Sequence, residues 1–296
     1  SRRRHTRSFH VTGVQTCALP ILTDAAIYSM QYLGPPYVYG FQLLQDNISV
    51  MGPKAAITIN NVTYWMGADK FFMYSGRVET LPCSVRQYVF QNLNKDQSYQ
   101  VFAASNEQYS EVWWFYCSTG STSVDSYVVY NYLDRVWYYG TMARTAWLDS
   151  GVLQYPIATD YNRRLLNHED GNDDSSGPGA VAIDAYIQSS DFDIGDGHNF
   201  GFVWRILPDV TFAGSSTANP SCTMVVKPRV NSGTPYGTPN AETVTRTQAY
   251  PVEEFTGQVY TRIRGRQMAF RIESAGVGTA WQLGAPRIDI RNDGRR

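Results

Sequence analysis

The sequence predicts an all-β protein, a partial β-propeller of four-stranded blades followed by a C-terminal β-sandwich domain. The chain is rich in aromatic residues, with 21 Tyr, 13 Phe and 7 Trp, which favour strands over helices. Short segments alternate between apolar and polar residues and are separated by Gly, Asn and Asp turns. A pattern of four such segments recurs at a spacing of roughly 40–50 residues, which is typical of propeller blades.

The first complete blade is predicted between residues 55 and 81. Residues 55–60 and 62–66 form a hairpin around Asn60-Asn61, because asparagine tolerates the left-handed backbone of a tight turn. Residues 71–74 and 77–81 form a second hairpin around Ser75-Gly76. Four short strands thus fit into fewer than thirty residues.

A second blade and two weaker units complete the predicted propeller over residues 22–169. The second blade has strands at 100–104, 111–117, 125–133 and 135–140. Its segment 112–116, Val-Trp-Trp-Phe-Tyr, is apolar on both faces, so a sheet is expected on each side of it. The weaker units are the segments 26–32 and 38–41, the remains of an earlier blade, and the segments 146–147, 154–156 and 164–167. Residues 84–92 are predicted to form a rim helix with Ser84 as the N-cap.

The composition changes abruptly after residue 169. Residues 170–180 are rich in Gly, Asp and Ser and are predicted to be a linker, because they cannot bury apolar area. Residues 181–296 show longer alternating strands and are predicted to form the sandwich. These strands are expected at 182–189, 200–212, 222–230, 242–249, 258–264, 267–274, 280–283 and 287–291. Two of them are predicted to pair as a hairpin around Gly265.

Residues 1–21 are predicted to lie outside the natural fold. Residues 1–7 and 11–21 match the in-frame translation of a sequencing-library adapter, and segments of that origin are excluded from fold reasoning. The rival interpretations are an Arg-rich leader, a nucleic-acid-binding arm or a signal peptide. Residues 22–296 open in mid-pattern without an initiator Met, so we expect the C-terminal portion of a longer product.

Excluding residues 1–21 changes the charge of the chain. Four of the 25 basic residues are lost, which leaves 21 against 26 acidic residues and a net charge of −5. A net-acidic chain is not expected to hold nucleic acid by a general electrostatic footprint. Cys83, Cys117 and Cys222 have no metal-binding or disulfide spacing and are expected to be small buried residues. No apolar run reaches the ~20 residues that a membrane span needs.

No enzymatic activity and no cofactor are predicted. The sequence has no GxSxG elbow and no phosphate-binding Gly loop, although a pair of carboxylates for glycoside cleavage cannot be judged from sequence. Asp191, Asp193 and Asp196 are weak metal candidates, because the third Asp comes one position late for a calcium loop. A strand that ends in a Gly-rich turn is the preferred interpretation. The acidic residues around His168 are likewise interpreted as a solvated loop.

Four arginines are the candidate functional residues, and they are predicted to form a basic stripe on the hairpin around Gly265: Arg262, Arg264, Arg266 and Arg271. The functional hypothesis is contact with DNA phosphates or with an acidic neighbouring subunit. The alternative is cross-strand pairing with nearby acids of the same chain, namely Glu253, Glu254, Glu273 and Asp289.

Several runs of residues resemble a family of tailed-phage structural proteins. They are NISVMGPKAA at 47–56, YWMG at 64–67, YSGR at 74–77, WWFY at 113–116, YVVYNY at 127–132, RGRQMA at 264–269 and WQLGAPR at 281–287. The runs are similar to those of tail tubular or nozzle proteins of short-tailed phages, and of the DNA-stabilisation hub proteins that occupy the equivalent place. These runs are structural rather than catalytic.

The resemblance implies a homo-oligomeric ring, commonly a hexamer in that family, below the portal and its adaptor. The protein would be made in the bacterial cytoplasm and located in the virion tail, where it forms or closes the channel through which double-stranded DNA passes. Such a conduit should bind DNA weakly, because each neutralised phosphate adds affinity that slows passage. The alternatives are a carbohydrate-binding or depolymerising tail protein and a cation-stabilised binding module.

Overall fold

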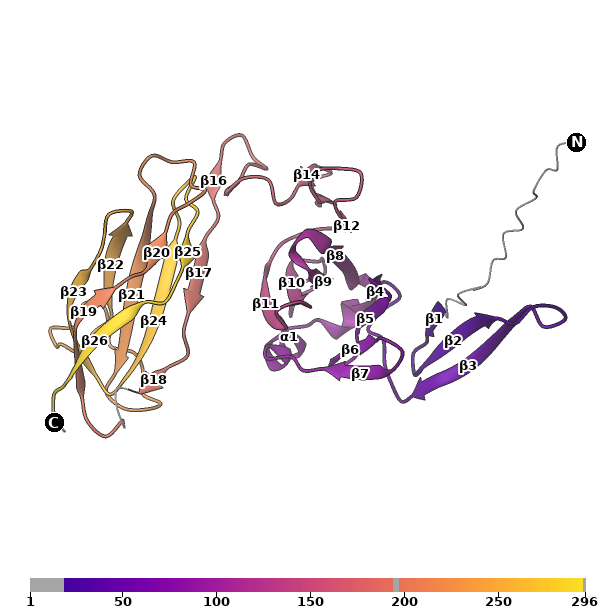
Figure 1. Cartoon of the computed structure of the whole chain (residues 1–296), viewed down its shortest axis with the longest axis horizontal. Coiled ribbons are helices and arrows are strands. Elements are labelled where there is room, and N and C mark those ends of the chain that lie inside the picture. The colour runs from indigo at the N-terminus through magenta and orange to yellow at the C-terminus, as the bar shows by residue number, and fades with distance from the viewer. Residues whose placement is uncertain (1–18, 194–196, 295–296) are drawn as a thin grey trace, which may run out of the picture. The chain divides into compact units, whose positions relative to one another are not determined.

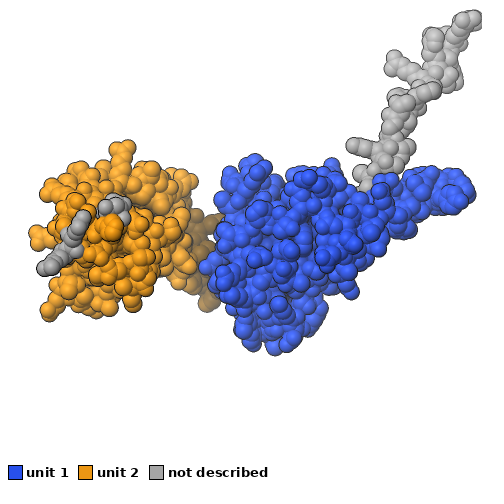
Figure 2. Space-filling view, turned by 90° about the horizontal axis from the view of Figure 1, so that it is seen from below, with its two compact units in different colours: residues 1–169 blue, residues 170–296 orange. Residues whose placement is uncertain are grey.

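The computed structural model describes residues 19–193 and 197–294, and these form an all-β protein of several small antiparallel sheets (Figure 1). The chain divides into two compact units between Glu169 and Asp170 (Figure 2). Within the described ranges the helices are short: α1 (Arg86–Gln91), η1 (Lys95–Gln100) and η2 (Glu107–Tyr109). None of the helices in these ranges has the length and apolar character to cross a membrane.

The described part of the first unit contains four sheets that follow one another along the chain. The first is β1 (Leu19–Leu22), β2 (Ala26–Tyr32) and β3 (Tyr39–Asp46). The second is β4 (Ala56–Ile59), β5 (Val62–Met66), β6 (Phe71–Tyr74) and β7 (Val78–Leu81). The third is β8 (Phe102–Asn106), β9 (Glu111–Tyr116), β10 (Ser126–Asn131) and β11 (Val136–Thr141). The fourth is β12 (Ala146–Leu148), β13 (Ile157–Thr159) and β14 (Leu165–Asn167).

Both predicted groups of four strands are present as four-stranded meanders. The turn between β4 and β5 has Asn60 at φ 50° and Asn61 at φ 63°, the left-handed pair that a two-residue hairpin requires. In the last sheet the segment at 154–156 is not a strand, and β13 takes its place three residues later. Pro156 cannot donate a backbone hydrogen bond, which explains why the strand begins after it.

Strand β9 is buried on both faces, as its sequence predicts. Every residue of β9 is buried; Trp114 belongs to a core shared with β5 and β6, and Trp113 stacks on Trp147 of β12 with ring centres 5.3 Å apart. The indole of Trp114 also donates to the carbonyl of Ala55 (3.1 Å) beside β4. Successive sheets therefore pack face to face, and their membership of a propeller stays a prediction.

The first sheet packs on the second through Ile27, Ile48, Trp65 and Phe72. This sheet includes Leu19–Leu22, which pairs with β2, so the exclusion of residues 1–21 from the fold is wrong for the last three of them. Apolar residues next to an open sheet edge can add a strand whatever their origin. Residues 1–18 lie outside the described ranges.

The rim helix is present as α1, but its cap differs from the prediction. The N-cap is Val85, and no side chain caps the helix, so Ser84 does not have the predicted role. Val89 is fully buried and fixes the helix on the core. Packing of this side chain therefore replaces a cap as the stabilising contact.

The second unit is a β-sandwich. The larger sheet has the order β17 (Ala185–Gln188), β24 (Gln267–Ser274), β21 (Ser221–Arg229) and β22 (Gln248–Glu253), with β18 (Phe192–Asp193) also on β24. The smaller sheet has the order β23 (Val259–Gly265), β19 (Gly201–Leu207) and β26 (Arg287–Asn292). Two further pairs are β15 (Asp173–Asp174) with β16 (Val181–Ala182) and β20 (Val210–Thr211) with β25 (Gln282–Leu283). Val203 and Ile263 of the smaller sheet meet Met224 and Ile272 of the larger sheet in one core.

The predicted hairpin around Gly265 is wrong in its pairing. Val259, Thr261 and Ile263 are buried and alternate with exposed or half-buried residues, as expected. However, β23 pairs with β19, and β24 pairs with β21 and β17, so Gly265 carries the chain from one sheet to the other. A Cβ at Gly265 would lie 3.0 Å from the Gln267 carbonyl oxygen, which explains the glycine at this crossing.

Two other expectations for the second unit need correction. The strand predicted at 242–249 begins only at Gln248. The predicted linker is tied to the sandwich, because Asp173–Asp174 pairs with β16 and the Asp173 carboxylate accepts from the backbone N–H of Gly278 at 2.8 Å. Short acidic segments can thus be ordered by hydrogen bonds without burying apolar area.

Candidate functional site

The four candidate arginines lie on two different faces of the sandwich. Arg262 and Arg264 point outward from the smaller sheet, while Arg271 points outward from the larger sheet. Arg266 lies in the connection between the two sheets. The structure therefore does not bring the four side chains into the single stripe that a hairpin would have made.

Arg264 and Arg266 share one aromatic ring. Their guanidinium groups lie 4.0 Å and 4.6 Å from the centre of the Phe200 ring. Arg264 also forms an ion pair with Asp293, and Arg266 donates to the side-chain oxygen of Asn231. Contacts of this kind between a cation and an aromatic ring contribute about 0.5–1 kcal/mol at exposed sites.

Arg271 pairs with Glu273, one of the acids named in the alternative, but along its own strand β24 and not across strands. Its guanidinium lies 2.6 Å from the Glu273 carboxylate and 3.9 Å from the centre of the Tyr186 ring. Asp289, another candidate acid, pairs instead with Arg205 at 2.5 Å. These partly exposed ion pairs contribute about 0–1 kcal/mol each, so they position the arginines more than they stabilise the fold.

The described acidic residues of the run 191–196 form hydrogen bonds and an ion pair with other side chains of the chain. Asp191 accepts from the Tyr236 hydroxyl (2.7 Å) and pairs with Arg229 (3.2 Å), and Asp193 accepts from the Gln267 amide (2.7 Å). Asp196 lies outside the described residues. Over residues 19–193 and 197–294 no group of three His, Cys, Asp or Glu side chains could hold a metal ion.

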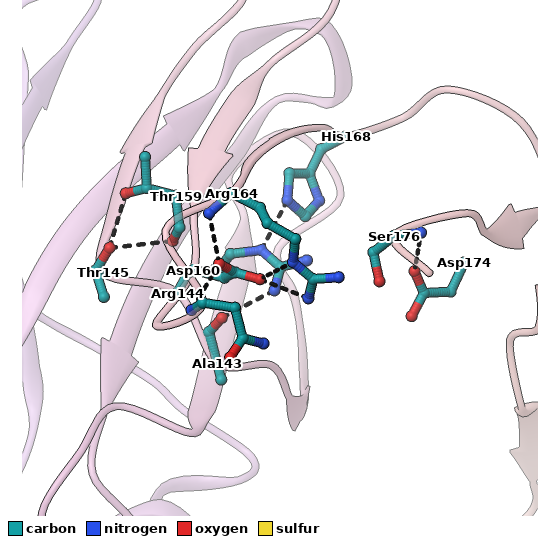
Figure 3. Close-up of polar contacts among 10 residues, drawn as sticks. Ala143, Arg144, Thr145, Thr159, Asp160, Arg164, His168, Asp174 and Ser176 are labelled. Carbon is teal, nitrogen blue, oxygen red and sulfur yellow. Dashed lines mark hydrogen bonds and ion pairs between the residues drawn. The ribbon is translucent and has the colours of Figure 1, made fainter. Parts of the chain in front are cut away.

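Hydrogen bonds and an ion pair connect the strands and turns of the sheet formed by β12, β13 and β14 (Figure 3). Arg144 donates to Nε2 of His168 at 2.9 Å, so that nitrogen is an acceptor rather than a free metal ligand. The pKa of Asp160 lies below its usual value, first because the backbone N–H of Arg164 donates to the carboxylate. Burial opposes this shift, and the Arg164 guanidinium, 2.6 Å away, adds to it.

Two carboxylates near β9 form a polar cluster that sequence reasoning missed. Glu111 is buried and accepts from the Trp113 indole (2.9 Å) and from the Tyr138 hydroxyl. Glu169 accepts from the Asn106 amide at 3.2 Å, and burial, followed by the charge of Glu111, raises its pKa. Since both oxygens of Glu111 accept from aromatic side chains, the cluster fixes aromatic rings at the edge of β9.

A cleft lies where the first strands of three sheets, β4, β8 and β12, come together. Its volume is about 670 Å³. Its aromatic lining is Tyr99, Phe102, Trp147 and Tyr161, and Lys54 adds a cation. Aromatic faces with a few polar groups form a surface on which a sugar ring can stack.

The strands β2 and β3 form a projecting ribbon (Figure 1), and this ribbon carries exposed apolar side chains. Seven large apolar side chains on it are half exposed or more: Tyr32, Leu33, Tyr37, Val38, Tyr39, Phe41 and Leu43. Tyr37 at the tip is 74% exposed. Contiguous exposed apolar surfaces of this kind mark sites of protein–protein contact.

No protein-family model and no curated protein sequence matches this chain.

Proposed function

We propose that this protein is a structural component of a phage tail, a nozzle or hub subunit that forms or closes the DNA exit channel below the portal. The runs that resemble phage tail proteins include residues 64–67, 113–116 and 127–132, which coincide largely with β5, β9 and β10. These strands build the two four-stranded sheets and their shared core. The resemblance therefore concerns residues that build the sheets and the core of the first unit.

The observation that carries the proposal is the exposed ribbon of β2 and β3. Transfer of a large apolar side chain from water to an interface is favourable by about 1.5–3 kcal/mol when burial is complete. Seven such side chains on one ribbon provide enough surface for a stable contact with a neighbouring subunit. Repetition of a contact between two different surfaces gives a closed ring or an open filament, and the proposed channel needs the closed ring.

The charge of the chain suits a passive channel. Without residues 1–21 the net charge is −5, and Arg264 and Arg271 are already paired with acids. A net-acidic wall repels DNA phosphates overall, so double-stranded DNA could pass without being held. The portal adaptor and other tail proteins are the partners that this location implies.

The test is assembly of the purified chain, measured by sedimentation velocity and electron microscopy. We expect rings from the natural chain, and their loss when Tyr37 and Phe41 are both changed to Ser. The matched control changes Val152 and Leu165, which are also exposed apolar residues, to Ser and should assemble normally. A chain that stays monomeric at every concentration would contradict the proposal.

The genes beside the coding sequence give an independent test. Portal and terminase genes next to it would support a tail component. Neighbouring genes for polysaccharide breakdown, without phage structural genes, would favour the second candidate function.

That second candidate is carbohydrate binding, favoured by the cleft around Trp147 and Tyr99. Titration with host polysaccharide should give binding that Tyr99→Ala weakens, since this ring is 63% exposed and supports no core. Tyr109→Ala, an exposed tyrosine outside the cleft, is the control. A reducing-end assay separates binding from depolymerisation, and no binding at all would reject this candidate.

A further inference from the structure

The outer face of the smaller sheet of the sandwich combines arginines with aromatic rings. We call it the arginine face and define it by Trp204, Tyr260, Arg262, Arg287 and Arg291. Ile288 packs against the core, so its neighbours in β26, Arg287 and Arg291, point away from the core. The three arginines are exposed, and Tyr260 is 64% exposed.

The arginine face carries uncompensated positive charge. Two other arginines of this sheet are neutralised locally, Arg205 by Asp289 and Arg264 by Asp293. In contrast, Arg262, Arg287 and Arg291 form no ion pair within the described part of the chain. Three positive charges therefore stand together on a chain whose formal net charge is −1.

The aromatic rings hold some of these cations in place. The guanidinium of Arg291 lies 4.9 Å from the centre of the Trp204 ring, and that of Arg205 lies 4.7 Å from it. The Trp204 and Tyr260 rings have centres 6.5 Å apart. Arg, Trp and Tyr are the residue types that dominate the energetic centres of protein interfaces, and a sheet holds them in fixed positions.

The arginine face cannot pair with its own copy across a two-fold axis. A two-fold contact would place Arg262, Arg287 and Arg291 against like charges, which costs several kcal/mol. The matching surface must therefore be acidic and must lie elsewhere on the partner. A contact between two different surfaces is heterologous, and its repetition gives a ring or a filament.

An acidic segment leads into the edge strand of the larger sheet of the same unit. Residues 170–188, which we call the acidic strip, contain Asp170, Asp173, Asp174 and Asp184 and no basic residue. The strip ends in β17, the edge strand of the larger sheet, where Tyr186 and Ile187 are 59% and 52% exposed. β17 belongs to the larger sheet and β26 to the smaller sheet, with the core between the two sheets, so one copy cannot join its own two surfaces.

We propose that the arginine face of one copy docks on the acidic strip of the next copy. The contact joins three guanidinium groups to a segment of net charge −4, and Trp204 and Tyr260 to exposed Tyr186 and Ile187. It rests on the proposed function, because it names a subunit contact of the ring. Its charged character predicts assembly that weakens as salt concentration rises.

A charge exchange tests the contact on the whole chain. One variant carries Arg262→Glu and Arg291→Glu, and the other carries Asp170→Lys and Asp184→Lys. Each alone should associate about 100-fold more weakly than the natural chain, because the first variant sets two glutamates against the acidic strip and the second brings the net charge of the strip from −4 to 0. An equimolar mixture should associate again, because the introduced glutamates of one variant then face the introduced lysines of the other. This rescue excludes misfolding as the cause of the loss.

The control variant carries Arg86→Glu and Lys95→Glu, the same charge change on exposed residues of the first unit, and should associate normally.

Assembly that survives in both charge variants, or a mixture that stays dissociated, would overturn this contact alone. A natural chain that remains monomeric in low salt would overturn the ring itself and with it the proposed function. A labelled single-stranded oligonucleotide tests the other use of the arginine face. If the natural chain binds it, and Arg262→Glu/Arg291→Glu abolishes this binding but leaves assembly intact, the arginine face belongs to nucleic acid and the contact is overturned.

Discussion

Replacement of Trp114 by Ala should destabilise the first unit and leave the second unaffected. Trp114 is fully buried, with its ring centre 4.9 Å from Phe71 and 6.0 Å from Trp137. Its indole also donates to the carbonyl of Ala55. Loss of a buried Trp side chain costs about 3–5 kcal/mol. For a unit of about 150 residues this lowers the melting temperature by about 6–20 °C.

Differential scanning calorimetry of the intact chain measures this effect. Trp114 lies in a core of the first unit, and Met224, also fully buried, lies in the core of the second. Met224→Ala should cost about 2–5 kcal/mol and is the matched control. We expect two transitions, of which Trp114→Ala lowers one and Met224→Ala the other. If both variants lower the same transition, or if Trp114→Ala costs less than about 1 kcal/mol, the assignment of separate cores is refuted.

Three further predictions concern titrating groups and a turn. The folded-state pKa of Asp160 is lowered, first by the Arg164 backbone N–H, so Asp160→Asn should reduce the free energy of unfolding at neutral pH. Denaturant melts should show that the stability difference between the natural chain and the variant vanishes as the pH falls through the folded-state pKa. Burial raises the pKa of Cys222 and partial burial that of Cys83, each to about 11. Mass spectrometry should therefore find slow alkylation of both at pH 8 in the native protein and rapid alkylation after unfolding, and equal rates in the two states would contradict the burial of these thiols. Asn61→Val should cost about 1–2 kcal/mol in the same melts, because its φ of 63° disfavours a β-branched residue, whereas Asn61→Gly should cost nothing.

The sequence is sufficient to predict the sheets whose strands are neighbours along the chain. The β4–β5 hairpin follows from Asn60-Asn61 and from alternation on each side, because both signals are local. The same signals mislead at Gly265. Alternation reports which side of a strand is buried, and that side is the same whether β23 pairs with β24 or with β19. A pairing partner is decided by the core of the whole unit, which no single segment records.

The cleft could not be predicted for a related reason. Lys54, Tyr99, Trp147 and Tyr161 come from segments separated by up to about a hundred positions, and each alone is compatible with a buried strand or a turn. Only the packing of three sheets brings them together. The four arginines give the converse case, because residues close in sequence were separated by a change of sheet.

Aromatic residues have two physical roles in this chain, and sequence alone does not separate them. Trp113 and Trp114 point to opposite faces of β9 and join it to the sheets on either side. Tyr37 and Phe41 also lie in an aromatic-rich segment but are exposed. If the exposed group serves assembly, its polar substitution should abolish rings without lowering the melting temperature, whereas substitution of Trp114 should lower the melting temperature first. A ribbon variant that loses both stability and assembly would mean that the exposed rings stabilise the subunit itself, and the proposed interface would lose its support.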